Sequence, residues 1–171
     1  MKKGLDEKHP GEENVFQDRK VMLLGAGGVA RAIAYGLIKE GAKVLICARD
    51  YKKAEALATA LDCKSIDWAE RINCECHAMV NCTPVGMHPN MNDSPFDPER
   101  FDKNTVVFDT VYNPEQTLFI KQAREAGCPT VTGIDMFVSQ AAKQFKLFTG
   151  TDPDMEAIRF EIKRAISAAK Y

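Results

Sequence analysis

The fold is decided by the stretch Val21-Met22-Leu23-Leu24-Gly25-Ala26-Gly27-Gly28-Val29-Ala30. Its first four residues are apolar, which predicts a strand buried on both faces, as in a parallel sheet. Gly25 then allows a tight turn, Gly27 lets the backbone approach a pyrophosphate, and Ala30 takes the small position where helix meets strand. The amides that open the helix attract an anion. We therefore expect a dinucleotide to bind at Gly25, Ala26, Gly27, Gly28 and Val29. The alternative, a glycine turn that is only a structural corner, has to be judged from the surrounding sequence.

The residues after the next strand bear on the choice of dinucleotide. This strand, Lys43–Cys47, is followed by Ala48-Arg49-Asp50. Folds of this class bind the adenosine ribose at this position. Arg49, with Lys53 one turn on, favours the 2′-phosphate of NADP. Asp50 favours the free 2′-hydroxyl of NAD if its side chain points inward, and Lys53 also fits a solvated helix face. We predict NADP, on the strength of Arg49.

Length and composition narrow the class of protein. The 171 residues suit one domain, and a formal net charge of −1 gives no basic footprint for nucleic acid. No apolar run reaches the roughly 18 residues that span a membrane, and no secretory signal is visible. Most of the six cysteines lie in or beside expected strands, which favours reduced thiols in the cytoplasm. Cys74-Glu75-Cys76-His77 lacks a second ligand pair, so no metal is expected.

Strand and helix patterns alternate along the chain. Strands are expected at Lys20–Leu24, Lys43–Cys47, Cys63–Ile66, Ala78–Asn81, Thr105–Asp109 and Thr130–Thr132. Helices are expected at Val29–Glu40, Lys52–Leu61, Glu115–Ala126 and Asp135–Phe148. This rhythm predicts an α/β fold: a Rossmann-like, doubly wound, parallel six-stranded sheet with helices on both faces. Residues 1–18 are predicted to be a polar tail or linker, and residues 19–171 the domain.

A last helix is expected after Thr151. Asp152 would be its N-cap and Pro153 its first residue. Its apolar residues recur at helical spacing, so one face should pack on the domain. They are Met155, Ile158, Ile162 and Ile166.

Three segments leave strand ends on the ligand side of such a sheet. They are Asn81–Met87, Asp109–Pro114 and Gly133–Ala141. Taken singly, each has a plain interpretation, because Tyr112 could cap an edge and Gln140 could face solvent. In this order and on these elements, they favour a shared cofactor and substrate site.

These motifs together resemble the nucleotide-binding domain of the shikimate dehydrogenase family. The resemblance runs from about Arg19 to the C-terminus. It rests on the glycine turn, Ala48-Arg49-Asp50-x-x-Lys53, Asn81-x-Thr83-x-x-Gly86-Met87, Asp109-x-x-Tyr112-x-Pro114 and Gly133-x-x-Met136-x-Val138-x-Gln140-Ala141. It implies NADPH-dependent reduction of 3-dehydroshikimate to shikimate in aromatic amino-acid biosynthesis. A quinate/shikimate paralogue and a non-catalytic nucleotide sensor stay open. Glutamyl-tRNA reductase and methylene-tetrahydrofolate dehydrogenase share the glycine turn and the arginine but lack the segment from Gly133.

The resemblance also implies residue roles. Cofactor contacts are expected from Gly25, Ala26, Gly27, Gly28, Val29, Ala48, Arg49, Asp50, Lys53, Thr83, Thr110, Gly133 and Met136, and substrate contacts from Tyr112 and Gln140. The chain departs from the family at Ala48 and Asp50, where asparagine and threonine are usual. The family's catalytic lysine and aspartate lie in a separate N-terminal domain, for which the segment before Arg19 is too short. We therefore expect no catalytic residue here, a missing catalytic domain as partner, and NADP(H) binding without turnover. The parent could also carry a dehydroquinate dehydratase domain, and a homodimer remains open.

Overall fold

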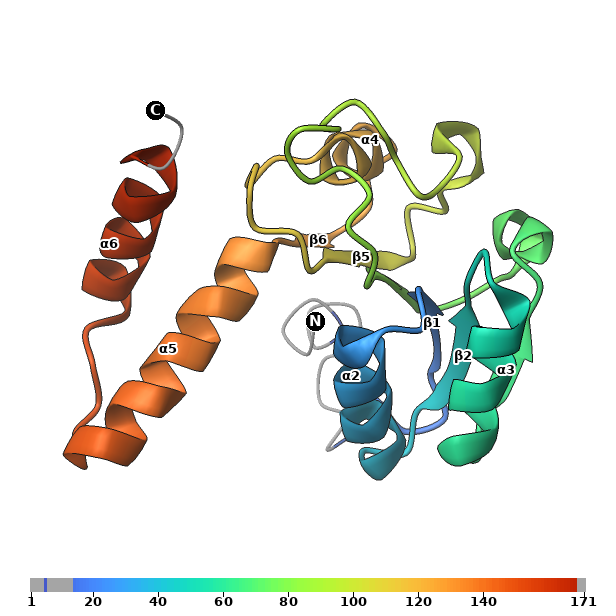
Figure 1. Ribbon diagram of the computed structural model, residues 1–171, viewed down its shortest axis with the longest axis horizontal. Coiled ribbons are helices and arrows are strands. Elements are labelled where there is room, and N and C mark those ends of the chain that lie inside the picture. Colours follow the sequence, from blue (N-terminus) through green and yellow to red (C-terminus); the bar gives the residue numbers. More distant parts are fainter. Residues whose placement is uncertain (1–4, 6–13, 169–171) are drawn as a thin grey trace.

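A computed structural model describes residue 5 and residues 14–168, and its central element is a parallel sheet (Figure 1). The strands are β1 (Lys20–Leu24), β2 (Lys43–Cys47), β3 (Lys64–Ile66), β4 (Ala78–Asn81), β5 (Val106–Asp109) and β6 (Thr130–Val131). Their order is β3-β2-β1-β4-β5-β6, and every neighbouring pair is parallel. The predicted doubly wound sheet is confirmed, with β3, β5 and β6 each one residue shorter than expected. The strand order reverses between β1 and β4, which is where folds of this class open a crevice for ligands.

The helices follow the strands as the sequence predicts. They are α2 (Gly28–Lys39), α3 (Tyr51–Ala60), α4 (Leu118–Glu125), α5 (Gly133–Thr149) and α6 (Met155–Ala168), with 3₁₀ turns η1 (Ala69–Asn73) and η2 (Pro98–Arg100). Helix α4 begins three residues later than expected because Thr117 caps it, its side chain accepting a hydrogen bond from Ile120 N. None of the helices among the described residues is long and apolar enough to cross a bilayer.

Successive residues of β1 point to opposite faces of the sheet and enter two separate cores. Val21 and Leu23 belong to the core that α2 and α3 cover, whereas Met22 and Leu24 belong to the one that α4 covers. All four side chains are fully buried, as a strand with helices on both faces requires. The expected helices on both faces are therefore present, and Figure 1 shows α4 above β5 and β6 and α2 below them.

Part of the segment expected to be a tail contributes to the core. Val15 and Phe16 are only 1% and 8% exposed and pack in the cluster that α2 and α3 cover, together with Leu5. Asp18 N also donates a hydrogen bond to Gly41 O at 3.0 Å, which ties this turn to the start of β2. The predicted polar tail or linker is therefore wrong for Val15 and Phe16, which belong to the domain core. Apart from Leu5, residues 1–13 lie outside the described residues.

Helix α6 packs on α5 and does not begin where expected. It starts at Met155, and the capping carboxylate is that of Asp154, which accepts hydrogen bonds from Glu156 N and Ala157 N at 2.9 and 3.2 Å. Asp152 instead pairs with Lys146 at 2.7 Å. The predicted N-cap at Asp152 is thus wrong, because another aspartate lies two residues closer to the helix.

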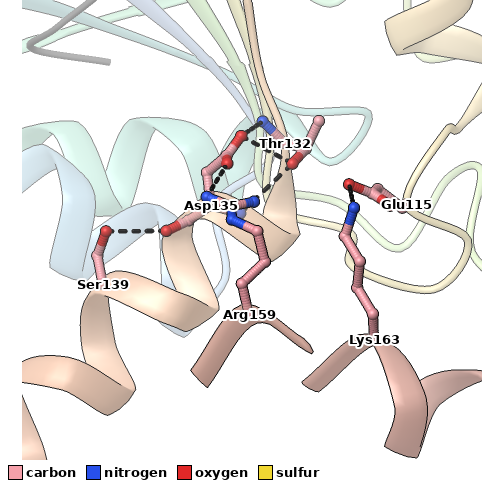
Figure 2. A network of polar contacts seen from close by, with 6 residues as sticks. All are labelled: Glu115, Thr132, Asp135, Ser139, Arg159 and Lys163. Carbon is pink, nitrogen blue, oxygen red and sulfur yellow. Dashed lines mark hydrogen bonds and ion pairs between the residues drawn. The ribbon is translucent and has the colours of Figure 1, made fainter. Parts of the chain in front are cut away.

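Two ion pairs tie α6 to the start of α5 and to the loop before α4 (Figure 2). Arg159 lies 2.9 Å from Asp135, and Lys163 lies 3.0 Å from Glu115. Burial acts to raise the pKa of Asp135, but hydrogen bonds from Thr132 and the charge of Arg159 outweigh it and hold that pKa below its usual range. The apolar face of α6 is only partly covered, since Ile158 and Ile162 are half-buried.

Candidate functional site

The glycine turn between β1 and α2 has the geometry that its sequence predicts. Gly25 has a φ of +117°, and its N–H donates to Cys47 O at 2.7 Å, so the turn is held against the end of β2. A Cβ on Gly25 would lie 3.0 Å from Cys82 O, whereas one on Gly27 or Gly28 would meet nothing within 4 Å. Gly25 is therefore required by conformation and contact. Gly27 and Gly28 leave the amides of α2 open to an approaching anion.

A pocket of about 700 Å³ lies beside this turn at the carboxyl ends of β1, β2 and β4. It brings together eight of the residues predicted to bind the cofactor: Gly25, Ala26, Gly27, Ala48, Arg49, Asp50, Lys53 and Thr83. Gly28 and Val29 follow the turn in the first residues of α2, and Val29 is 46% exposed. The pocket has the place and size of a nucleotide site in a fold of this class.

Asp50 serves as the N-cap of the next helix. Its Oδ1 accepts a hydrogen bond from Lys53 N at 3.3 Å, and its Oδ2 lies 3.5 Å from Lys53 Nζ. The carboxylate is thus engaged by the first turn of α3 and by a cation. Asp50 and Lys53 thus pair with each other. Arg49, at the same end of β2, forms no ion pair with any described residue.

A buried polar network lies under the crevice at the ends of β4 and β5. Asn81 Nδ2 donates to Asp109 Oδ1 at 3.0 Å, and Thr117 Oγ1 donates to Asp109 Oδ2 at 2.6 Å. Thr83 Oγ1 donates to Asn81 Oδ1 at 2.6 Å. Burial raises the pKa of Asp109 to about 6, against the effect of three hydrogen-bond donors that favour the carboxylate. The network fixes the loops that leave both strands.

Asn81 and Asp109 each begin one of the sequence motifs, but neither was predicted to be a site residue. Both are fully buried, and Leu24 of β1 is paired with Asn81 in the sheet. The signal that could have identified them is a polar residue closing each of two apolar strands. Such residues must find partners inside the protein, because an unpaired buried polar group is costly.

The loop after β5 is pressed against the start of α5. A Cβ on Gly133 would lie 2.3 Å from Val111 O, so no larger residue fits there. Thr110 Oγ1 donates to Asn81 O at 2.8 Å, which holds the loop to the end of β4. Met136 is partly buried against the core that α2 and α3 cover. Thr110, Gly133 and Met136 lie outside the lining of the pocket, and their contact with the cofactor stays a prediction.

The two residues expected to contact substrate lie on this same side. The ring of Tyr112 stacks on Phe137 with centroids 5.4 Å apart, and both side chains are more than 40% exposed. Gln140 is exposed on α5, nearly one helical turn beyond Phe137. Neither Tyr112 nor Gln140 lines this pocket, so their role in binding also stays a prediction.

Trp68 and Arg71 also line the pocket, although no sequence motif includes them. Trp68, the single tryptophan of the chain, follows β3, and the guanidinium of Arg71 lies 4.1 Å from the centroid of its ring. Only a tertiary contact could have identified them, because Arg71 Nε donates at 3.0 Å to Pro95 O, which lies 24 residues away.

The cysteines form no disulfide in this structure. Cys47 and Cys128 are buried, and the other four are half-buried. Burial raises the pKa of Cys47 and Cys82 to about 12, which disfavours the thiolate. Across residue 5 and residues 14–168, no cluster of three or more His, Cys, Asp or Glu side chains has the arrangement of a metal site.

Two family models match the chain. Residues 9–82 match the shikimate/quinate 5-dehydrogenase model, and residues 133–159 match the model of the shikimate 5′-dehydrogenase C-terminal domain. Among curated relatives, the NADP(+) shikimate dehydrogenase of Maridesulfovibrio salexigens is 40% identical over 84% of this chain and 53% of its own length. The bifunctional chloroplastic 3-dehydroquinate dehydratase/shikimate dehydrogenase of Arabidopsis thaliana is 37% identical over 82% of this chain and 24% of its own length.

Solved structures agree with these matches. A shikimate dehydrogenase in complex with NADP+ has a TM-score of 0.81 and 31% identity, over 96% of this chain and 59% of that one. The quinate dehydrogenase of Corynebacterium glutamicum in complex with NAD has a TM-score of 0.80 and 31% identity, over 95% and 59%. The chain thus spans about half the length of the bacterial relative and about a quarter of the plant one. On the sequence matches, the fold and the pocket at the strand ends, the chain belongs to the shikimate/quinate 5-dehydrogenase family.

Proposed function

We propose that this chain is the NADP(H)-binding domain of a shikimate dehydrogenase, which reduces 3-dehydroshikimate to shikimate. The observation that carries the proposal is the pocket that joins the glycine turn to Arg49 and Lys53. The turn suits a diphosphate, and a guanidinium at the end of β2 suits an additional phosphate on the ribose. In that complex the nicotinamide supplies the hydride, and the protein supplies alignment.

The preference for NADP is supported by the partners of the charged groups. Arg49 lines the pocket and makes no ion pair with any described residue, so it can bind a phosphate without losing one. Asp50 is held by the first turn of α3 and by Lys53 Nζ at 3.5 Å. A carboxylate that caps its own helix is less disposed to select a free ribose hydroxyl.

Calorimetric titration of the purified chain with NADP+ and NAD+ tests this proposal. We expect binding of both, with NADP+ at least tenfold tighter. Tighter binding of NAD+ would support the second candidate, a quinate dehydrogenase that uses NAD, for which the Corynebacterium glutamicum structure at 31% identity is the precedent. Failure of both coenzymes to bind folded protein would contradict the proposal.

The catalytic partner is the second part of the proposal. The two last helices carry exposed apolar side chains, which we call the α5–α6 apolar group: Phe145, Leu147, Phe148, Met155 and Phe160. Leu147 and Phe148 are 83% and 87% exposed, and such a group of side chains marks an interaction surface. We infer that it meets the domain that the longer relatives carry. Dimerisation through it is the competing outcome, which sedimentation of the chain alone would reveal.

A chimera tests the whole activity. The chain alone should not oxidise shikimate, because no residue of its predicted site is expected to accept the proton that the substrate hydroxyl loses. Replacing the matching 145 residues of the Maridesulfovibrio salexigens enzyme by this chain should restore NADP+-dependent shikimate oxidation. In that chimera, Gln140→Ala should raise the KM for shikimate and leave the KM for NADP+ unchanged. A folded chimera that binds NADP+ without turnover would favour a nucleotide sensor.

A further inference from the structure

The far end of the nucleotide pocket contains a guanidinium held by three contacts. Arg71 lies over the Trp68 ring at 4.1 Å, its Nε donates to Pro95 O at 3.0 Å, and its Nη1 donates to Trp68 O. Pro95 is buried, and the next residue, Phe96, packs in the core that α4 covers. The guanidinium is therefore fixed in place before any ligand arrives, which reduces the entropic cost of binding.

These contacts leave the Nη2 amino group of Arg71 available to bind a ligand. Nη2 donates to no acceptor within the described part of the chain, whereas Nε and Nη1 each donate to a carbonyl. A phosphate is best bound by two parallel N–H groups of one guanidinium. A guanidinium has two such pairs; in Arg71 one has lost Nε to Pro95 O, and the other shares Nη1 with Trp68 O, so Arg71 suits a single neutral acceptor better than a phosphate.

The position of Arg71 in the pocket also favours a neutral acceptor, namely the base of the dinucleotide. Arg49 and Lys53 lie after β2, where the 2′-phosphate is expected, and the glycine turn takes the diphosphate. The base is joined to the same ribose as the 2′-phosphate, so it must lie close to Arg49. The remaining lining includes Trp68, Arg71 and Pro95. A purine presents ring nitrogens that accept hydrogen bonds at its edge.

We propose that Arg71, held on Trp68, donates a hydrogen bond from Nη2 to the adenine base of the bound dinucleotide. This inference deepens the proposed function and rests on it. It assigns recognition of the base to a residue after β3, separate from the recognition of the 2′-phosphate by Arg49. A contact to the base is common to NADP+ and NAD+, whereas a contact to the 2′-phosphate exists only in NADP+.

The experiment measures both coenzymes on the 171-residue chain, with NAD+ titrated directly or as a competitor of NADP+. Arg71→Met should weaken both by the same factor, about 3- to 10-fold, the usual size of one lost hydrogen bond. Arg71→Lys, which keeps the charge but loses the anchored geometry, should weaken both by a similar factor. Arg49→Met is the matched control and should weaken NADP+ far more than NAD+. The ratio between wild type and Arg71→Lys should not change between 50 and 500 mM KCl.

Each other outcome has a definite meaning. A loss confined to NADP+ would assign Arg71 to the phosphate and overturn the inference, as would a loss in Arg71→Lys that shrinks with salt. Unchanged affinity for both coenzymes with a lowered Tm would leave Arg71 only a structural role, which also overturns it. Absence of coenzyme binding by the wild-type chain would instead contradict the proposed function, so the two failures are distinguishable. If Arg71→Met does not fold, Arg71→Lys alone decides.

Discussion

Asn81 and Asp109 close two neighbouring parallel strands, and the 3.0 Å hydrogen bond from Asn81 Nδ2 to Asp109 Oδ1 joins the loops that leave them. Thr117 and Val111 N complete the partners of the carboxylate. The nucleotide pocket and the loop before α5 therefore share one buried support. A change in the charge of Asp109 should therefore affect the loops after both β4 and β5.

Asp109 should make the stability of the protein depend on pH. Burial raises its pKa from 3.8 to about 6, so the folded state binds more protons than the unfolded state between these values. Its contribution to stability is full below about pH 4 and is lost as the pH rises through 6. Asp109→Asn keeps an acceptor for Val111 N and has no charge to bury. Its free energy of unfolding, relative to wild type, should rise by about 3 kcal/mol between pH 4 and 7.5 in urea titrations, from two pKa units at about 1.4 kcal/mol each. A difference that stays constant over this range would contradict the prediction.

Arg49→Met should remove most of the preference for NADP+. A charge-assisted hydrogen bond contributes about 1.5–3 kcal/mol, so affinity for NADP+ should fall by about 10- to 100-fold while affinity for NAD+ changes less than about twofold. Lys52→Met is the control, because Lys52 is exposed and lies outside the pocket lining. Equal losses in the two variants would mean that only general charge matters.

Asp50→Asn should improve binding of NADP+. Asparagine caps a helix about as well as aspartate, so Tm should change little, and a negative charge near the expected 2′-phosphate would be gone. We expect NADP+ to bind about two- to fivefold more tightly, measured by calorimetry at low salt, where exposed charges matter most. A large loss of NAD+ affinity would show instead that Asp50 holds the ribose hydroxyls.

Gly133→Ala should destabilise the protein. Its Cβ would lie 2.3 Å from Val111 O and 2.8 Å from Tyr112 N, both backbone atoms, so the start of α5 has to move. A cost of about 1–3 kcal/mol is expected in urea unfolding. Gly36→Ala in α2 is the matched control, since its Cβ meets nothing within 4 Å. That substitution should stabilise by about 0.5–1 kcal/mol, because alanine loses less entropy in a helix. Equal effects would show that α5 has room at its start.

Local patterns were sufficient for most of the elements. Residues 21–24 are apolar on both faces and the following glycines admit a ligand, so strand, turn and helix could be assigned from one short stretch. Local patterns did not identify the cap of α6, because Asp152 was predicted and Asp154 caps the helix. Only packing against Lys146 on one side and α6 on the other separates them.

The sequence by itself determined the parallel sheet, its order of helices and the glycine turn, because burial and backbone conformation act over a few neighbouring residues. The tertiary structure decided which groups meet: Val15 and Phe16 with the core, Asn81 with Asp109, and Arg71 with Pro95. These contacts depend on where the chain returns after many residues. A local pattern of polarity or spacing cannot show which distant residues come into contact.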